Sequence, residues 1–85
     1  MEEILLANGF TYKGFCSTCG GQAKEYRKVM GNRLIIVKTK GTLRNRPTGQ
    51  EWTESGAATI KIGGSITRVT KTEYLLSTLE YMNLV

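Results

Sequence analysis

The sequence contains no histidine, and it has only one proline, one tryptophan and two cysteines. Without an imidazole the chain lacks the side chain that most often serves as a general base near neutral pH, and it can form neither a Ser-His nor a Cys-His pair. Glu51 and Glu54 suggest paired carboxylates, but they lie in a polar stretch where solvated surface charge is the simpler interpretation. No G-x-x-x-x-G-K-[ST] pattern surrounds Gly63-Gly64-Ser65. We therefore expect a protein that is not an enzyme.

Long apolar runs are also missing. No segment approaches the roughly 18 apolar residues of a membrane-spanning helix. The first residues, Met1-Glu2-Glu3, are acidic where a secretory signal peptide would be basic. The sequence accordingly predicts an intracellular protein, without a membrane partner and with reduced thiols. Its 85 residues, 40% of them hydrophobic, predict a single domain over 1–85 with a small core.

The two cysteines, Cys16 and Cys19, lie three positions apart in the stretch "GFCSTCGGQ". This spacing is that of a zinc knuckle, but structural zinc takes four ligands, normally Cys or His. Zinc at Cys16 and Cys19 therefore requires carboxylates or a second chain that completes the site. A redox role is disfavoured because Gly20-Gly21 opposes the helix that would activate a thiolate. We interpret the stretch as a turn and expect no cofactor, with zinc shared between chains as the alternative.

Charge is unevenly distributed along the chain. The formal charge is +5, yet residues 24–46 alone carry +7, with Glu25 as their only acid. Such a segment favours a polyanion or an acidic protein surface as partner. The residues that we expect to bind a polyanion are Lys38, Lys40, Arg44, Arg46, Arg27, Lys28 and Arg33. Trp52 and Arg46 are expected to anchor protein contacts, since Trp and Arg dominate binding hot spots. Tyr12, Tyr26 and Trp52 are candidate stacking faces for bases.

The apolar pattern predicts an α+β domain, with a small antiparallel sheet of four to six strands, a short N-terminal helix and an amphipathic C-terminal helix. We expect strands at residues 10–16, 22–30, 33–40, 58–62 and 65–69, and a bent strand at 42–46. Tight turns are predicted at Gly31-Asn32 and Gly63-Gly64.

Two further segments have distinct predictions. Asn45 to Gly56 is polar and reads as a long loop that offers a contact surface. Thr70 and Glu73 predict a capping box at the start of the last helix. That helix would place Leu75, Leu76, Leu79 and Met82 on one face.

Several short pieces within residues 5–44 occur together: a helix ending in "NGFTYKGFC", a "CGG" turn, "KEYRK" and "LIIVKTKGTLR". In these pieces the chain resembles small uncharacterised proteins carried by bacteriophages of gut bacteria. The resemblance implies a phage or mobile-element setting, and with it a location in the host cytoplasm or in a virion, and it assigns no site residue. We expect a non-catalytic, small basic binding module, an accessory structural subunit of a phage-type particle or other large assembly. The alternative is a sequence-tolerant accessory or regulatory protein that binds DNA or RNA. In either case the chain is expected to be oligomeric or bound among protein neighbours.

Overall fold

The computed structural model of the chain contains one five-stranded antiparallel sheet and two short α-helices. It describes residues 2–18 and 21–85, and the side chains of residues 2–15 and 22–85. In chain order the elements are α1 (Glu2–Ala7), β1 (Thr11–Thr18), β2 (Gly21–Met30), β3 (Arg33–Arg46), β4 (Gly49–Ile62), β5 (Ser65–Val69), the 3-10 turn η1 (Thr72–Tyr74) and α2 (Leu75–Tyr81). The predicted α+β domain, with its antiparallel sheet and two terminal helices, is confirmed.

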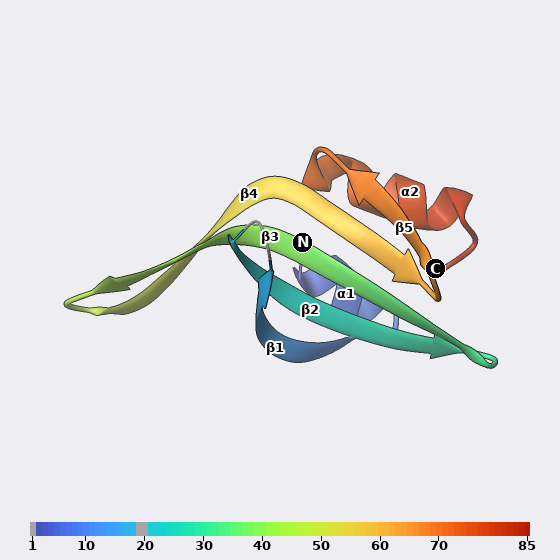
Figure 1. Cartoon of the computed structure of the whole chain (residues 1–85), viewed down its shortest axis with the longest axis horizontal. Helices are drawn as coiled ribbons and strands as arrows, with labels where there is room; N and C mark the ends of the chain where they lie inside the picture. Colours follow the sequence, from blue (N-terminus) through green and yellow to red (C-terminus); the bar gives the residue numbers. More distant parts are fainter. Residues whose placement is uncertain (1, 19–20) are drawn as a thin grey trace.

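Each strand pairs with its neighbour in sequence, in the order β1-β2-β3-β4-β5 (Figure 1). The predicted tight turns at Gly31-Asn32 and Gly63-Gly64 join β2 to β3 and β4 to β5. Gly31 and Gly63 have φ angles of 62° and 58°, in the left-handed region that two-residue hairpin turns need and that glycine adopts without strain. Short local turns therefore account for the order of these strands.

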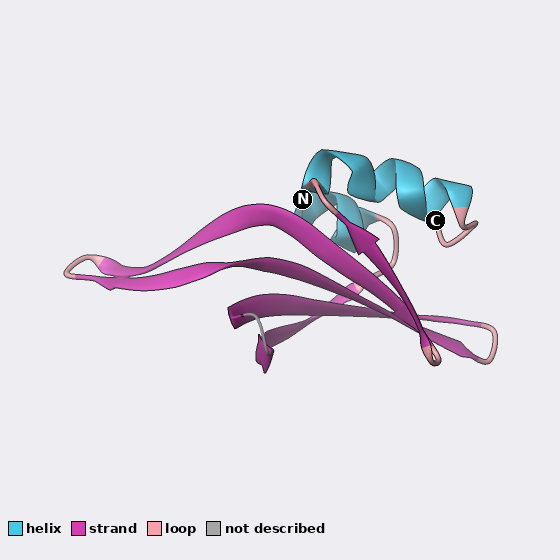
Figure 2. Ribbon diagram, turned by 45° about the horizontal axis from the view of Figure 1, so that its top comes forward, coloured by secondary structure: helices cyan, strands magenta, loops and turns pink. Residues whose placement is uncertain are grey.

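Both helices lie on the same face of the sheet (Figure 2). Alternate residues of the strands point to that face, so that Ile35 and Val37 of β3 and Ile60 of β4 are buried. The buried hydrophobic core consists of Leu5, Phe10, Ala23, Tyr26, Ile35, Val37, Ala58, Ile60, Val69, Leu75, Leu79 and Leu84. Helices of six and seven residues are marginal on their own, so packing against the sheet is what holds them.

The predicted capping box at the C-terminal helix is wrong. α2 begins only at Leu75, after the turn η1, and Lys71 occupies the N-cap position of η1 with no side-chain cap. Lys71 is extended (φ −136°), because the chain needs this length to pass from the sheet to the helix layer. Within the predicted apolar face of the helix, Leu75 and Leu79 are fully buried. Leu76 and Met82 are half-buried.

The predicted loop from Asn45 to Gly56 is also wrong. β3 runs on to Arg46, β4 begins at Gly49, and only Pro47-Thr48 forms the turn between them. The segment predicted as a separate bent strand, 42–46, is the continuation of β3. Sequence reasoning missed the strand because both sides of this hairpin are mostly exposed, so no apolar residue alternates with polar ones.

Beyond Gly41 in β3 and before Ala58 in β4, the two strands pair only with each other in the part of the chain that the structure describes. The pairing of β2 with β3 ends at Gly41, and the pairing of β5 with β4 ends at Ala58. We call residues 41–56 the arm; it projects beyond the helices and the rest of the sheet (Figure 1). The arm makes the molecule elongated, with extents of 43 × 23 × 22 Å.

Candidate functional site

The face of the sheet opposite the helices is covered by no described element of the chain, and we call it the open face (Figure 2). The strand register assigns its residues, because side chains alternate between the two faces. Its centre is formed by two rows of cross-strand partners that run from β2 to β5. The first row is Arg27, Ile36, Lys61 and Ile66, and the second is Glu25, Lys38, Thr59 and Arg68. The row between them, Tyr26, Val37 and Ile60, points the other way and is buried.

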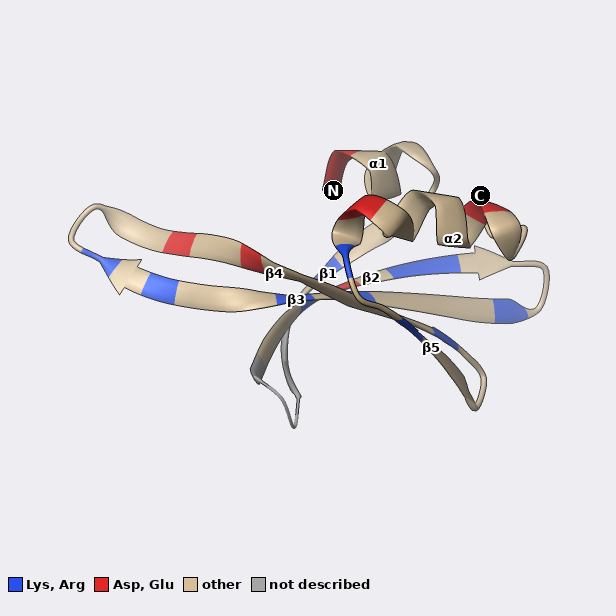
Figure 3. Cartoon of the chain, turned by 90° about the horizontal axis from the view of Figure 1, so that it is seen from above, with Lys and Arg blue, Asp and Glu red and all other residues tan. Residues whose placement is uncertain are grey.

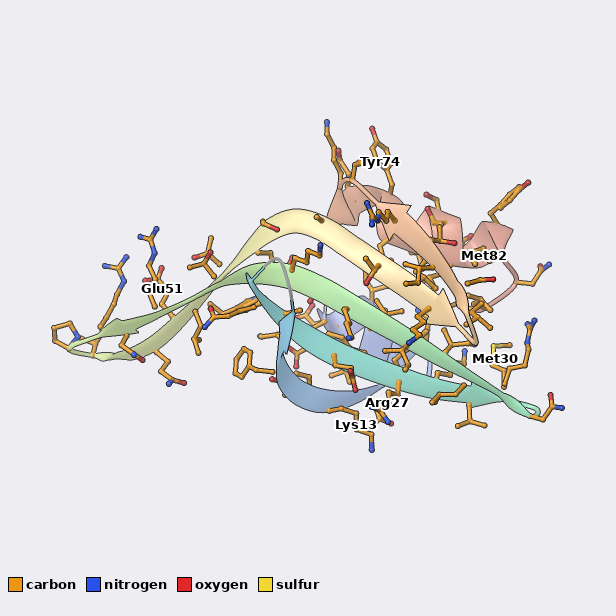
Figure 4. All side chains as sticks on the ribbon, in the orientation of Figure 1. Lys13, Arg27, Met30, Glu51, Tyr74 and Met82 are labelled. Atoms are coloured by element: carbon orange, nitrogen blue, oxygen red, sulfur yellow. The ribbon has the colours of Figure 1, made fainter. Side chains whose placement is uncertain are left out.

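Cations from all five strands gather on the open face. They are Lys13 of β1, Arg27 of β2, Lys38 and Lys40 of β3, Lys61 of β4 and Arg68 of β5. Lys13 lies at a bulge between Tyr12 and Gly14, and it lines a shallow hollow of about 320 Å³ together with Arg27. Figure 4 shows the Lys13 and Arg27 side chains close together. The meander thus unites charges that are far apart in sequence.

Glu25 is the one acidic residue that the register places on the open face. Its carboxylate lies 2.7 Å from Arg27 Nε and 3.9 Å from Lys38 Nζ, so one acid orients two cations. Among the described residues, no ion pair involves the other four cations of the face, Lys13, Lys40, Lys61 and Arg68. The Arg27 and Lys38 side chains are 43% and 31% exposed, and ion pairs to cations that remain in contact with solvent contribute little to stability, so the main effect of Glu25 is on side-chain position.

Acidic residues gather on the helix side instead. Glu2 and Glu3 lie in α1, Glu73 in η1 and Glu80 in α2. Figure 3 shows acidic segments on the helices and most basic segments on the strands. Three cations, Lys24, Lys28 and Lys71, lie on the same side as these acids, so the helix side is close to neutral. An anionic partner is therefore attracted to the open face more strongly than to the helix layer. The fold therefore also sets the orientation in which a polyanion would approach.

One end of the open face carries apolar side chains as well. Val29, Leu34 and Ile66 are 70%, 41% and 60% exposed. Leu34 lines a second shallow hollow, of about 450 Å³, together with Arg33 and Lys61. Grouped apolar side chains at the surface of a small protein are typical of a contact surface. The face is thus basic throughout and partly apolar near the β2–β3 and β4–β5 turns.

The structure divides the predicted polyanion-binding residues among three places. Arg27, Lys38 and Lys40 lie on the open face. Arg33 pairs with Met30 beside the β2–β3 turn, at a register position of the helix-covered face, and lines the second hollow at that end of the sheet. Arg44 and Arg46 lie on the arm, where Arg46 forms an ion pair with Glu51.

Lys28 lies on the helix-covered face. Its Nζ donates a hydrogen bond to the Leu84 carbonyl (2.9 Å) and lies 5.5 Å from the centre of the Phe10 ring. Lys28 therefore fastens the end of the chain to the sheet.

Sequence reasoning did not select Lys13, Lys61 or Arg68 as part of the site. They are separate from the basic segment at residues 24–46, and only the meander brings them beside it. The alternation of the strands could have identified Lys61 and Arg68. Lys61 follows the buried Ile60 and Arg68 precedes the buried Val69, so both side chains point away from the core. A search for basic residues that are close together in the sequence therefore found only part of the basic surface.

Trp52, predicted as a protein-contact anchor, packs at the base of the arm. Its ring lies directly beside Gly41, where an added Cβ would come within 2.5 Å of Trp52 Cζ2. The Phe15 ring centre is 5.5 Å from that of Trp52, and Lys24 Nζ lies 5.1 Å from the Trp52 ring centre. The indole Nε1 is buried and has no hydrogen-bond acceptor among the described residues. The role of Trp52 in a protein contact stays a prediction; within the chain it joins the arm to β1 and β2.

Of the aromatic residues predicted to stack on bases, Tyr26 is only 1% exposed, so that prediction is wrong for this residue. Burial raises the pKa of the Tyr26 hydroxyl far above its ordinary value, and the nearby Glu2 carboxylate, which accepts a hydrogen bond from it, raises the pKa further. Tyr26 is therefore a neutral core residue. Tyr12 packs against it, with ring centres 5.3 Å apart, on the helix-covered side.

The described residues also bear on metal binding and on membrane insertion. Within the side chains that the structure describes, no three metal-ligating residues come together. Cys19 and the Cys16 side chain lie outside the described residues, so the shared zinc site stays a prediction. No helix in the described part of the chain has the length and apolar character needed to cross a membrane.

Comparisons of the chain with protein-family models, with curated proteins and with solved structures found no match. The resemblance to phage-borne proteins therefore stays a prediction. The fold and the open face define a small α+β protein with an uncovered, basic sheet surface, and its function has to be argued from that surface.

Proposed function

We propose that the chain is a non-catalytic binding module that holds nucleic acid by its phosphate backbone on the open face. The observation that carries this proposal is the separation of charge across the fold. Six cations from five strands meet one acid on the open face, whereas on the helix side four acids lie with three cations, Lys24, Lys28 and Lys71. Lys and Arg side chains at this density match a row of phosphates, which supply the sequence-independent part of nucleic-acid binding.

The net charge of the face sets the expected salt dependence. If its net five charges each neutralise one phosphate of a duplex, log K falls with log salt at a slope of about −4.5. Affinity then drops about 500-fold between about 50 mM and about 200 mM salt. Binding of this kind is tolerant of sequence, because phosphate contacts position a protein without reading bases.

A pair of matched variants tests the proposal. Lys61→Gln removes one charge from the centre of the open face, and Lys71→Gln removes the same charge beside the helix layer. Titration of a labelled oligonucleotide, followed by fluorescence anisotropy at several salt concentrations, gives the slope for each variant. We expect Lys61→Gln to make the slope shallower by about 0.9 and Lys71→Gln to leave it unchanged. Absence of binding at about 50 mM salt, or equal effects of both variants, contradicts the proposal.

A second candidate function is that of an accessory structural subunit in a phage-type particle or another large assembly. The observation in its favour is the exposed apolar end of the open face, at Val29, Leu34 and Ile66, because phosphates do not need apolar contacts. If this candidate holds, the chain co-sediments at fixed stoichiometry with a larger particle from the cells that produce it. Ile66→Thr, which keeps a β-branched residue in β5, should release it, whereas Tyr81→Ser on α2 should not. A chain that sediments only as a monomer contradicts this candidate.

A further inference from the structure

The arm is firmly held at its base and has few contacts towards its tip. At the base, Trp52 packs beside Gly41, the Ser55 hydroxyl donates to the Lys40 carbonyl (3.2 Å), and the Leu43 amide donates to Gln22 Oε1 (2.6 Å). Towards the tip, the described side-chain contacts are the Arg46–Glu51 ion pair and a hydrogen bond from Gln50 to Asn45 (3.4 Å). Two-stranded hairpins are marginal in water without a third partner. The tip is therefore the part of the chain that gains most from a partner outside it.

The shape of the arm limits what that partner can be. The arm contains six cross-strand pairs, which at a rise of about 3.3 Å per residue make it about 20 Å long. A two-stranded ribbon fits into the major groove of B-form DNA, which is about 12 Å wide, whereas the major groove of A-form RNA is too narrow for side-chain access. The dimensions of the arm match duplex DNA.

The side chains of the arm also match a groove better than a phosphate row. The cations Arg44 and Arg46 are balanced by Glu51 and Glu54, so the arm as a whole has no net charge. Near its tip the arm exposes side chains that can form hydrogen bonds, among them Asn45 and Gln50. Amide side chains pair with the edges of bases in the major groove. An arm without net charge would gain little from phosphates alone.

Continuity along β3 connects the arm to the open face. Lys38 and Lys40 on the body and Arg44 and Arg46 on the arm all belong to this one strand, whose pairing with β4 shifts register between Thr39 and Gly41 at the base of the arm. The arm is twisted, and β3 and β4 cross in the view of Figure 1 between the body and the tip. One strand thus leads from the phosphate-facing cations into the ribbon.

The aromatic side chains argue against a single-stranded partner. Proteins that hold single strands stack bases on exposed rings. Here the rings of Tyr12, Phe15 and Trp52 gather around Lys24 Nζ, at 6.0, 5.8 and 5.1 Å from its nitrogen. Lys24 in turn pairs with Glu2 of α1 at 3.7 Å, so this cluster lies on the side of the helices and not on the open face. Among the described residues, the cation–ring contacts involve only Lys24 and Lys28, and none involves a cation of the open face.

The geometry points to double-stranded B-form DNA as the partner, with its phosphates on the open face and the arm in its major groove. This inference rests on the proposed function and adds the form of nucleic acid and the element that selects it. The body supplies most of the salt-dependent affinity for any nucleic acid, and the arm adds affinity for duplex DNA alone.

A shortened arm separates the two contributions. Leu43 and Trp52 pair directly, so residues 44–51 can be replaced by Asn-Gly, which forms a two-residue hairpin turn. The deletion removes a net charge of +1, the same as Lys61→Gln, which serves as its control. Each protein is titrated against a DNA duplex, one of its strands alone, and an RNA duplex of the same sequence. Emission of Trp52 and thermal melting show that the shortened chain is folded.

We expect the shortened arm to weaken binding of duplex DNA by about tenfold more than binding of the other two. Lys61→Gln should weaken binding of all three to a similar extent. Preference of the wild-type chain for single strands, or an equal effect of arm shortening on all three, overturns the inference while leaving the proposed function intact. Absence of binding to all three overturns the proposed function itself.

A measurement on the unmodified chain covers the case in which the shortened variant does not fold. Guanine N7 lies in the major groove and adenine N3 in the minor groove, and dimethyl sulfate methylates both. The wild-type chain should protect guanine N7 in the duplex. Protection of adenine N3 alone, or of neither site in a saturated complex, overturns the placement of the arm.

Discussion

Replacement of Gly41 by alanine tests how the arm is held. A Cβ at this position would lie 2.5 Å from the Thr53 carbonyl oxygen and 2.5 Å from Trp52 Cζ2, where ordinary contact begins at 3.4 Å. Both neighbours must therefore withdraw by about 1 Å. The Trp52 ring can rotate, but the Thr53 carbonyl belongs to the backbone of β4. Relief of the contact thus requires β3 and β4 to move apart at the base of the arm.

These distances allow an estimate of the loss of folding free energy in Gly41→Ala. Overpacking by one methyl group costs about 1–3 kcal/mol of folding free energy, and the smaller conformational freedom of alanine in the unfolded chain offsets up to about 1 kcal/mol of it. We expect a net loss of about 1–2 kcal/mol. In a domain of this size that loss lowers Tm by about 5–15 °C.

The single tryptophan of the chain makes the assay local, because Trp52 is the residue that has to move. Gly41→Ala should shift Trp52 emission to longer wavelength and increase its quenching by acrylamide. Gly64→Ala is the matched control, since nothing lies within 4 Å of a Cβ at that position. A Gly41→Ala protein with the emission and Tm of the wild type would refute the close packing of Trp52 against Gly41.

Three further substitutions test the core, and a fourth, at the surface, is the control for the first. Leu79→Ala empties a fully buried site and should cost about 2–5 kcal/mol in urea unfolding; Leu6→Ala, at a site 46% exposed, should cost less than half as much, and equal losses contradict the assigned core. Tyr26 keeps its proton in the folded protein at a pH where an unfolded tyrosine, with a pKa of 10.0, releases it, so stability should fall as pH rises above about 10 by up to about 1.4 kcal/mol per pH unit. Tyr26→Phe should lose that part of the pH dependence, and an unchanged slope contradicts the raised pKa. Thr39→Val removes a buried hydroxyl that has no described partner and should raise stability by about 1 kcal/mol, so a lower Tm would count against it.

Local patterns predicted most of the sheet. Alternation in "ATIKI" identified the last five residues of β4, and Gly31 and Gly63 marked two of the turns. Both patterns could be recognised because they depend on residues adjacent in sequence. The start of α2 was misplaced for the opposite reason. Thr70 and Glu73 have the spacing of a capping box, but the path from β5 to the helix layer needs an extended Lys71, which a local pattern does not contain.

The arm shows the limit of hydrophobic periodicity. A strand is recognised by its buried face, and residues 44–51 have none, so the polar composition was read as a loop. Their pairing follows from the continuation of β3 and β4 beyond their neighbours, which is a property of two strands together.

The sequence by itself determined the fold class, the two turns and an excess of positive charge in residues 24–46, because these depend on composition and on neighbours along the chain. Only the tertiary structure decided where that charge lies. The meander adds Lys13, Lys61 and Arg68 to the face that holds Lys38, and it turns Lys28 towards Leu84. Placing a side chain on one face or the other depends on strand register and on what the helices cover, and both arise from contacts between residues distant in sequence.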